Sequence, residues 1–495
     1  MICQRNHNAD EGMVTEMNKP IIQITNGVTR HPEKRMAEPV CLTINRGEQL
    51  AIVGDNASGK SRLVDIITGR YPLLQNETAC DFSRIKYITF RDSYGTADGN
   101  YYYQQRWNQH DIADDMPTVG DLLKNAAASH SSSTGSMGHL GFIEQSLIPL
   151  FDKPIITLSS GEMRRFQLAR AMLSCPQVLI IDNPFIGLDA PTREMLARLL
   201  QALAERDELT LILVVSKAED IPPFITHILP VAELRMGEKT TKENYMAQCQ
   251  VSSATLVSQE TEKSEQSSVI TEEQPPTVVD FRNVSIRYGN RTILKELNWT
   301  VRQGEHWALS GANGSGKSTL LSLVCADNPQ SYACDVSLFG HRRGTGESIW
   351  DIKRRIGYVS PEMHRAYIKD IPAIDIVASG LSDSIGLYFR PRPEQKECCV
   401  HWMQIFGISH LADRTFLQLS SGEQRLCLLA RAFVKNPDLL ILDEPLHGLD
   451  ARNCTLVKQI IEDYCRTSDK TLIMVTHYEE ELPPCIDHRL YLEKN

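Results

Sequence analysis

Two glycine-rich segments of the chain have the residue types and spacing of a loop that binds phosphate groups. GDNASGKS starts at Gly54 and GANGSGKS starts at Gly311, so both read G-x-x-x-x-G-K-S. Glycine lets successive backbone N–H groups point at a phosphate, and the following helix presents its positive end to the same group. Two such matches in one chain disfavour a merely structural turn. The predicted nucleotide-binding residues are Gly54, Asp55, Asn56, Ala57, Ser58, Gly59, Lys60 and Ser61, and Gly311, Ala312, Asn313, Gly314, Ser315, Gly316, Lys317, Ser318 and Thr319.

The lysine and the serine that close each segment are predicted to act directly on a nucleoside triphosphate. Lys60 and Lys317 are expected to reach the β- and γ-phosphates, and Lys317 is assigned a catalytic role. Ser61 and Ser318 are expected to bind Mg²⁺ through their hydroxyl groups. The cofactor predicted from these residues is therefore Mg²⁺, bound together with the nucleotide.

Two aspartates stand at the ends of apolar, strand-like runs. Asp182 ends LIID and Asp443 ends LILD. A lone aspartate at the end of a strand is usually a helix cap or a turn residue. Downstream of a phosphate-binding loop, it is more often the carboxylate that holds Mg²⁺ through a water molecule. Both aspartates are therefore predicted metal ligands.

The residues that follow these aspartates differ between the two copies. Glu444 follows Asp443 and can orient or deprotonate an attacking water molecule, whereas Asn183 cannot accept a proton. His477 in VTHYEE is predicted to donate to the γ-phosphate, and Lys217 in VVSKAED occupies the matching position. Either change alone is compatible with neutral drift. Two changes at hydrolytic positions of the same copy predict a damaged hydrolysis site, with Glu444 and His477 catalytic in the other copy.

An aromatic side chain ahead of each loop is a candidate platform for a nucleotide base. Tyr288 lies 23 residues before Gly311, and the same count back from Gly54 gives His31. Bases stack on aromatic faces, and histidine offers the smaller platform. The alternative is an exposed aromatic residue at the end of a strand.

The elements that must position these residues repeat along the chain. The two glycine-rich segments are 257 residues apart, and both the LSSGE motifs and the strand-end aspartates are 261 residues apart, which indicates two homologous domains. In each copy strand-like runs alternate with helical stretches, an order that predicts a mostly parallel sheet. The expected division is a flexible tail over 1–19, a first domain over 20–235, a polar linker with one helical piece over 236–276, and a second domain over 277–495.

Composition excludes several classes of protein. The chain has 495 residues and a net charge of −10, which gives no overall attraction to nucleic acid. Its longest apolar runs fall far short of the roughly 20 residues of a membrane span. The 13 cysteines form no C-x-x-C pair and are interpreted as reduced thiols. The expected location is the cytoplasm, with peripheral attachment to the cytoplasmic face of the inner membrane as a possibility.

Together these motifs resemble the ABC-type ATPases over nearly all of both domains. Paired phosphate loops, LSSGE motifs, strand-end aspartates, GLD segments at 187–189 and 448–450, and His477 carry the resemblance. It implies an α/β fold: two tandem ABC ATPase domains, each with a P-loop, mostly parallel sheet core, a β subdomain and a helical subdomain. It also implies ATP hydrolysis and a head-to-tail association of the two domains.

The family's signature motif implies a further set of contacts to the γ-phosphate. In a head-to-tail pair, each nucleotide lies between the phosphate loop of one half and the signature of the other. LSSGE departs from the usual LSGGQ of the family, but it keeps the first serine and the second glycine. The signature residues carried over by this resemblance are Ser159, Ser160, Gly161 and Glu162, and Ser420, Ser421, Gly422 and Glu423.

A second departure concerns the glutamine that the family places after the strand following the phosphate loop. Here the corresponding segments read VSPE, which ends at Glu362, and TFRDS, which contains Asp92. Either carboxylate is a hard oxygen ligand that could replace the glutamine at Mg²⁺, and Glu362 is included among the predicted metal ligands. This change weakens the expectation of ordinary coupling to a membrane subunit.

The resemblance suggests transport, with a separate membrane permease subunit as partner. Residues 339–367 resemble a group of tandem ATP-binding proteins associated with molybdate transport and photorepair. The alternative is an ABC ATPase that acts on the ribosome or RNA, or in DNA repair. The segment over 236–276 lacks a lysine stripe, so nucleic acid is an unexpected partner.

Overall fold

The computed structural model describes residues 20–74, 77–89, 117–129, 147–155, 158, 160–206, 209–253, 275–288, 291–361, 363, 367, 370–384 and 391–494. The predicted tail over 1–19 lies outside these ranges. Contacts divide the described chain into two compact units. The first holds the described residues up to Ile186 and from Pro191 to Ser253, and the second holds Gly187–Ala190 and the described residues from 275 onward.

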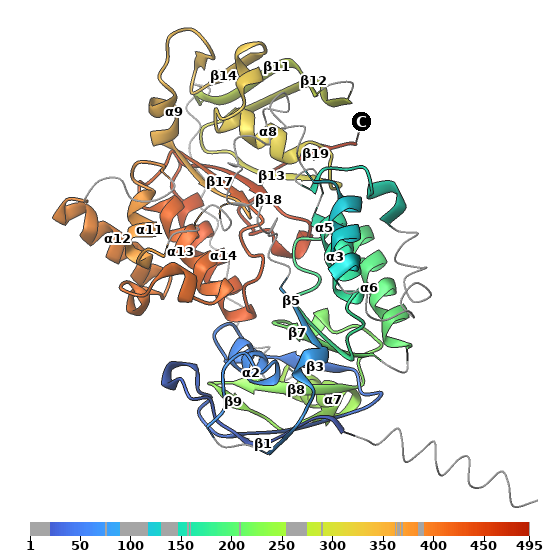
Figure 1. Ribbon diagram of the computed structural model, residues 1–495. Helices are drawn as coiled ribbons and strands as arrows, with labels where there is room; N and C mark the ends of the chain where they lie inside the picture. Colours follow the sequence, from blue (N-terminus) through green and yellow to red (C-terminus); the bar gives the residue numbers. More distant parts are fainter. Residues whose placement is uncertain are drawn as a thin grey trace, which may run out of the picture. The chain divides into compact units, whose positions relative to one another are not determined.

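The first unit is built on a mostly parallel sheet with strand order β10-β8-β3-β7-β6-β5, in which β9 also pairs with β8 (Figure 1). A separate antiparallel sheet has the order β2-β1-β4. The strands are β1 (Pro20–Gly27), β2 (Val40–Asn45), β3 (Leu50–Val53), β4 (Glu77–Ala79), β5 (Ile85–Thr89), β6 (Val178–Asp182), β7 (Thr210–Val215), β8 (His227–Ala232), β9 (Arg235–Met236) and β10 (Thr240–Thr241).

Helices of the first unit connect these strands. Helix α2 follows β3 directly, and α5 and α6 come before and after β6. The longer helices are α2 (Lys60–Ile67), α3 (Val119–Ser129), α5 (Ser160–Met172), α6 (Ala190–Ala204) and α7 (Lys242–Ser253), with short 3-10 turns at Pro32–Lys34, Phe82–Arg84, Ile148–Leu150 and Ala218–Asp220.

Part of the predicted linker is folded. Strand β10 pairs with β8, and α7 follows it within the first unit. The polar composition of this stretch suggests a linker, but β9 and β10 both pair with β8, a contact that the sequence pattern did not reveal. Strand β10 and helix α7 thus lie within the stretch assigned to the linker by composition, and the limits of the linker stay a prediction.

The second unit repeats this plan. Its parallel sheet has the order β16-β17-β18-β13-β19, and its antiparallel sheet has the order β12-β11-β14-β15. The strands are β11 (Thr277–Tyr288), β12 (Arg291–Arg302), β13 (His306–Gly311), β14 (Asp335–Leu338), β15 (His341–Arg342), β16 (Ile356–Val359), β17 (Leu439–Asp443), β18 (Thr471–Val475) and β19 (His488–Leu492).

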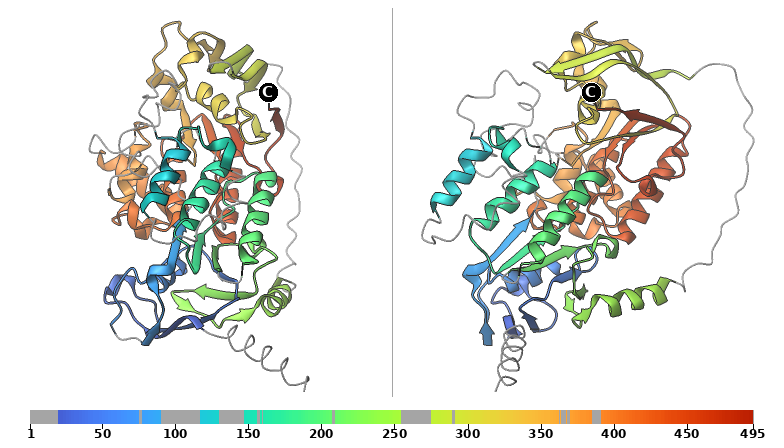
Figure 2. Two further views of the ribbon diagram at one scale, coloured as in Figure 1. Left: turned by 45° about the vertical axis from the view of Figure 1, so that its right-hand side comes forward. Right: turned by 90° about the vertical axis from the view of Figure 1, so that its right-hand side faces the viewer.

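Two groups of helices accompany these sheets in the second unit. Helix α8 packs with the antiparallel sheet in one apolar cluster, and α11 to α14 form another cluster with residues of the parallel strands (Figure 2). The helices are α8 (Lys317–Val324), α9 (Ile349–Arg355), α11 (Ala373–Ser379), α12 (Pro393–Ile405), α13 (Ser421–Phe433) and α14 (Ala451–Cys465), with 3-10 turns at Pro329–Tyr332, Ser409–Leu411, Phe416–Gln418 and Glu479–Glu481.

The parallel strands are buried on both faces, which explains their continuous apolar sequences. LLIL in β17 and TLIMV in β18 are entirely buried, as are LAIV in β3 and TLILVV in β7. Parallel strands covered on both faces need apolar residues at every position rather than alternation. The predicted fold class is therefore confirmed. Polar residues cluster where these strands end, and that edge carries the predicted site.

Among the described residues, none of the helices combines the length and the apolar composition that crossing a membrane requires.

Candidate functional site

The phosphate loop of the second unit joins β13 to α8 and depends on glycine. Gly311, Gly314 and Gly316 have φ angles of 150°, 79° and 99°, which other residues rarely adopt. A Cβ atom at Gly311 would lie 2.5 Å from the carbonyl oxygen of Leu492 and 2.7 Å from the hydroxyl of Ser315. A side chain at Gly311 would therefore force the loop to move.

Lys317 is the first residue of α8 and folds over this loop. Its Nζ donates to the carbonyl oxygens of Gly311 at 2.7 Å and Ala312 at 3.1 Å. Burial lowers the pKa of Lys317, although the nearby carboxylates of Asp443 and Glu444 act in the opposite direction. The lysine and both carboxylates thus share one neighbourhood, as the sequence predicts.

The first unit has the same loop between β3 and α2, with two residues changed. Gly54 is required because a Cβ atom there would lie 2.0 Å from the carbonyl oxygen of Val231. Lys60 Nζ donates to the carbonyl oxygens of Gly54 at 2.5 Å and Asp55 at 2.7 Å. Ala57 holds a φ of 61° where the second loop has Gly314. The first loop therefore keeps its shape at a cost in backbone strain.

The two strand-end aspartates lie at equivalent places in their sheets. Asp443 pairs in register with Val475, and Asp182 pairs with Val214 on the corresponding strand. The Asp182 carboxylate accepts a hydrogen bond from the Tyr87 hydroxyl at 2.9 Å. Its other oxygen accepts from the Asn183 side-chain amide at 3.0 Å. The first aspartate is therefore held by two neutral donors.

Glu444 and His477 are brought together in the second unit. His477 Nε2 lies 3.2 Å from Glu444 Oε1, and His447 Nδ1 lies 3.4 Å from Glu444 Oε2. Burial alone would raise the pKa of Glu444, but the hydrogen bond from His477 and the charges of His447, His477 and Arg425 outweigh it and lower that pKa to about 2. The carboxylate is therefore ionised at neutral pH and can accept a hydrogen bond from water.

The backbone at Asn183 repeats that at Glu444 almost without change. The φ angles are 47° and 50°, and each N–H donates over 2.8 Å to the carbonyl oxygen of a neighbouring strand, Val214 or Val475. The structure corrects one prediction here: Ser216, not Lys217, lies opposite His477 at the spacing of 261 residues, because Lys217 and Tyr478 are the residues that precede the equivalent 3-10 turns Ala218–Asp220 and Glu479–Glu481. The two copies thus differ in side-chain chemistry on a shared scaffold.

A buried arginine, which the sequence analysis overlooked, fixes this loop in each unit. Arg425 of α13 donates to the carbonyl oxygens of Asp443 at 2.9 Å and Pro445 at 3.3 Å, and also to that of Glu444. Arg164 of α5 donates to the carbonyl oxygens of Pro184 and Ile186. The sequence carries a signal for these arginines, because each is the second residue after an SSGE motif.

The signature segments stand at helix starts. Ser420 caps α13: its hydroxyl accepts from the Glu423 N–H at 3.3 Å, and its own N–H donates to the Glu423 carboxylate at 2.7 Å. This reciprocal pair is a capping box, which accounts locally for the SSGE sequence. In the first unit Glu162 pairs with Lys153 at 2.8 Å. Ser159 lies outside the described residues, as does the predicted metal ligand Glu362.

The two predicted base platforms have different surroundings. Tyr288 is half-buried, its hydroxyl accepts from the Asn328 amide at 3.0 Å, and burial raises its pKa. His31 is exposed, and its ring centroid lies 5.3 Å from that of Tyr71 in an edge-to-face arrangement. Tyr71, which the sequence analysis did not select, therefore adds an aromatic surface beside His31.

The residues present fit Mg²⁺. Each unit offers a hydroxyl in the first turn of the helix after the loop, Ser61 or Ser318, and a carboxylate at a strand end. Asp443 is only 8% exposed and lies close enough to Lys317 to raise its pKa. Mg²⁺ commonly takes one or two protein oxygens and completes its shell with phosphate oxygens and water.

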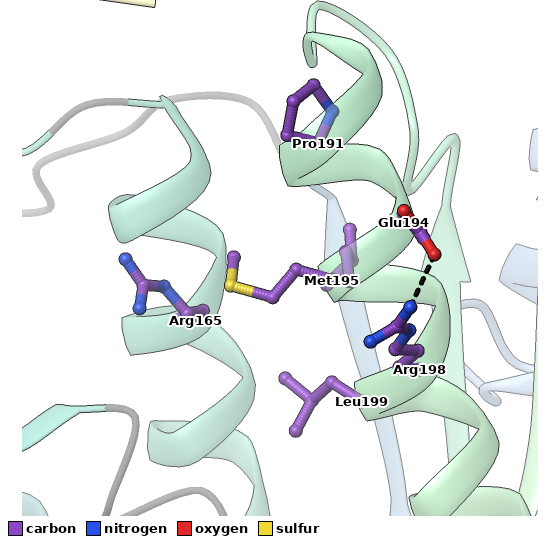
Figure 3. Close-up of a pocket in the computed structure, with 7 residues that line it drawn as sticks. Arg165, Pro191, Glu194, Met195, Arg198 and Leu199 are labelled. Atoms are coloured by element: carbon purple, nitrogen blue, oxygen red, sulfur yellow. Dashed lines mark hydrogen bonds and ion pairs between the residues drawn. The ribbon is translucent and has the colours of Figure 1, made fainter.

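A separate cavity in the first unit is unrelated to this chemistry. It has a volume of about 290 Å³ and lies between α5 and α6 (Figure 3). Apolar atoms of Met195 and Leu199 face it, and Arg198 pairs with Glu194 at its rim. None of the predicted phosphate-binding residues lines it.

The fold and the two loops define a protein with two P-loop nucleotide-binding domains. The family described as ABC transporter matches residues 37–186 and again residues 294–447. The chain is 36% identical over 481 residues to the ABC transporter ATP-binding protein ModF of Escherichia coli (strain K12), covering 95% of this chain and 96% of that protein. It therefore belongs to the ABC transporter family and is an ABC-type ATPase.

Further similarities extend over the whole chain. An uncharacterized ABC transporter ATP-binding protein of Schizosaccharomyces pombe, C323.04, is 29% identical over 92% of this chain and 94% of its own length. Among solved structures, the archaeal ribosome recycling factor aABCE1, in complex with ribosomal stalk protein aP1, matches with a TM-score of 0.52. That match has 18% identity and covers 94% of this chain and 87% of that one. This last similarity concerns the fold alone.

Proposed function

We propose that the two nucleotide sites have unequal roles, with ATP turned over at the site of the second unit and held at that of the first. The observation that supports this most directly is the matched pair of loops after β17 and β6. One carries the carboxylate of Glu444, with Oε1 3.2 Å from His477 Nε2, and the other carries Asn183 on the same backbone. The first site thus keeps the means to bind nucleotide while it loses the group that can take a proton from water.

The residues of the second site divide the work of hydrolysis among them. Lys317 neutralises charge on the β- and γ-phosphates, and Ser318 and Asp443 would hold Mg²⁺. Bound Mg²⁺ neutralises the charge that develops on the phosphate oxygens. Glu444 orients the attacking water and accepts its proton, and His477 donates to the γ-phosphate. In the first site, Asn183 can orient water but cannot take its proton.

The family resemblance supports a head-to-tail arrangement as part of this proposal. Ser159 and Gly161 would then complete the competent site, and Ser420 and Gly422 would complete the slow one. ATP held at the slow site would keep the two halves associated while the other site cycles. The domain limits predicted above belong to the same proposal.

A pair of matched substitutions tests the unequal roles. In steady-state phosphate release by the full chain, Lys317→Ala is expected to remove activity, and Lys60→Ala is expected to weaken it without removing it. Equal losses in the two variants, together with nucleotide trapped at only one site, would mean that the first site is needed for closure. Equal losses with turnover at both sites would contradict the proposal.

We further propose that the ATPase energises transport, with molybdate as the cargo class suggested by the resemblance of residues 339–367 described above. The chain would then act at the cytoplasmic face of a membrane with a separate permease subunit. To test this, tagged Glu444→Gln protein, which should retain ATP, is recovered from cells with its partners and compared with Lys317→Ala. A permease that copurifies with the first variant and not the second supports transport. Copurifying ribosomes or DNA would instead favour the alternative functions.

A further inference from the structure

A second histidine contacts the carboxylate of Glu444. The predicted partner, His477, follows β18 and reaches Oε1, whereas His447 comes from the loop between β17 and α14 and reaches Oε2 at 3.4 Å. The Glu444 side chain is 16% exposed, and those of His477 and His447 are 9% and 22% exposed. The carboxylate is therefore held from both oxygens in a largely enclosed place.

The backbone fixes His447 in this position. Glu444 adopts a φ of 50°, and the N–H of His447 donates back to the Glu444 carbonyl oxygen at 3.2 Å. Leu446 and Leu449 are buried on either side of the turn, and Gly448 follows with a φ of 78°. The turn itself therefore brings the imidazole ring of His447 back toward the carboxylate of Glu444.

His477 cannot serve two acceptors with one nitrogen. Its Nε2 contacts Glu444, and the proposed hydrolysis requires a donation to the γ-phosphate as well. A ring nitrogen carries one hydrogen, so directing Nε2 to the phosphate gives up its hold on Oε1. The Glu444 carboxylate then needs a second hydrogen-bond donor to keep its orientation toward the attacking water. His447 already contacts its other oxygen, Oε2.

The first unit supplies an independent comparison. The constant spacing of 261 residues places Ile186 at the position of His447. Arg164 and Arg425 fix the loop in both units, so the scaffold is retained. The side chain of isoleucine has no hydrogen-bond donor. The histidine thus occurs in the unit that has the carboxylate, and an apolar residue occurs in the unit that has Asn183.

We propose that His447 is a positioning residue for ATP hydrolysis, which holds Oε2 of Glu444 and keeps that carboxylate directed at the attacking water while His477 serves the γ-phosphate. The inference rests on the proposed function of the second site. It concerns the rate of turnover rather than the binding of ATP, because His447 is assigned to the carboxylate and not to the nucleotide.

Steady-state ATPase kinetics of the full chain test this role. His447→Ala is expected to lower kcat about tenfold, a typical effect of losing a hydrogen bond to a charged group, with KM for ATP changed less than about twofold. His447→Asn, whose amide can replace Nδ1 as donor, is expected to restore most of the rate. His447→Ile, which copies the first unit, should behave like alanine. His410→Ala, an exposed histidine of the same unit, is the matched control.

A double-mutant cycle separates positioning from a structural role. If His447 acts through the carboxylate, His447→Ala should cost nothing further in a Glu444→Gln background. An additive loss there, an unchanged kcat in the single variant, or no recovery with asparagine would overturn the inference while leaving the ATPase assignment intact. If Glu444→Gln leaves the ATPase activity unchanged, that result would overturn the proposed function itself, and the inference with it.

Discussion

The loops that follow β6 and β17 differ in their side chains and hardly at all in their backbones. Both hold a left-handed residue after the aspartate, both donate to the neighbouring strand over 2.8 Å, and both are fixed by a buried arginine. The first loop carries Asn183 and Ile186 where the second carries Glu444 and His447. The comparison teaches that a site can lose its reactive groups while the protein keeps the scaffold that held them.

The conformation itself adds to this contrast. Asparagine tolerates a left-handed backbone better than glutamate does. Glu444 therefore occupies a position that suits its chemistry more than its conformational preference, as is common at active sites. Asn183 occupies the equivalent position with less strain and without the charge.

The largest effect is expected from the carboxylate. Glu444→Gln should lower the rate of phosphate release by about 10²–10⁴, because glutamine keeps the shape of the side chain but cannot accept a proton. Asn183→Gln should change the rate less than about twofold. Steady-state ATPase measurements on the two variants check this, and comparable losses would show that the loops are functionally alike.

A smaller difference is expected between the two aspartates. Asp443→Asn should raise the Mg²⁺ concentration needed for half-maximal ATPase activity by about tenfold or more, because it removes a charged ligand. Asp182→Asn should leave that requirement nearly unchanged, since turnover is assigned to the other site. Mg²⁺ titrations of the ATPase rate provide the measurement. A shift of equal size in both variants would argue for hydrolysis at both sites.

The shared scaffold can be tested by transplanting the reactive groups. In a Glu444→Gln background, Asn183→Glu combined with Ser216→His is expected to raise the residual rate by about tenfold, because general base catalysis is worth at least that much where geometry is kept. Asn183→Asp with the same second change is the control, since its carboxylate is one methylene short. No gain with glutamate would mean that the matching backbones are insufficient.

The smallest effect is expected at the second glycine of the phosphate loop. Gly314→Ala places a side chain at a φ of 79° and should destabilise the second unit by about 1 kcal/mol. Ala57→Gly relieves the same strain in the first unit but adds chain entropy, for a net gain of about 0.5 kcal/mol. Thermal denaturation without nucleotide measures both. Stability changes of opposite sign for the two substitutions would support the difference between the loops, and changes of the same sign would contradict it.

The parts of the molecule written in short, local motifs could be predicted from the sequence. The glycine loops, the strand-end aspartates and the alternation of strands and helices follow from residue types at fixed spacing. His447 could not be found this way, because its role arises from a turn that brings it back over Glu444. Strand β10 was also missed, since two threonines carry no pattern and are held only by pairing with β8. The assignments of the site residues remain predictions.

The carbonyl oxygen of Leu492 would lie only 2.5 Å from a Cβ atom at Gly311. Strand β19 pairs with β13 along the whole length of β19. One wall of the second phosphate loop is thus made by a residue that stands 181 positions later in the sequence than Gly311. Translation must therefore pass Leu492 before this loop has its support. A stop codon within β19 would leave the loop sequence complete and the wall behind it missing.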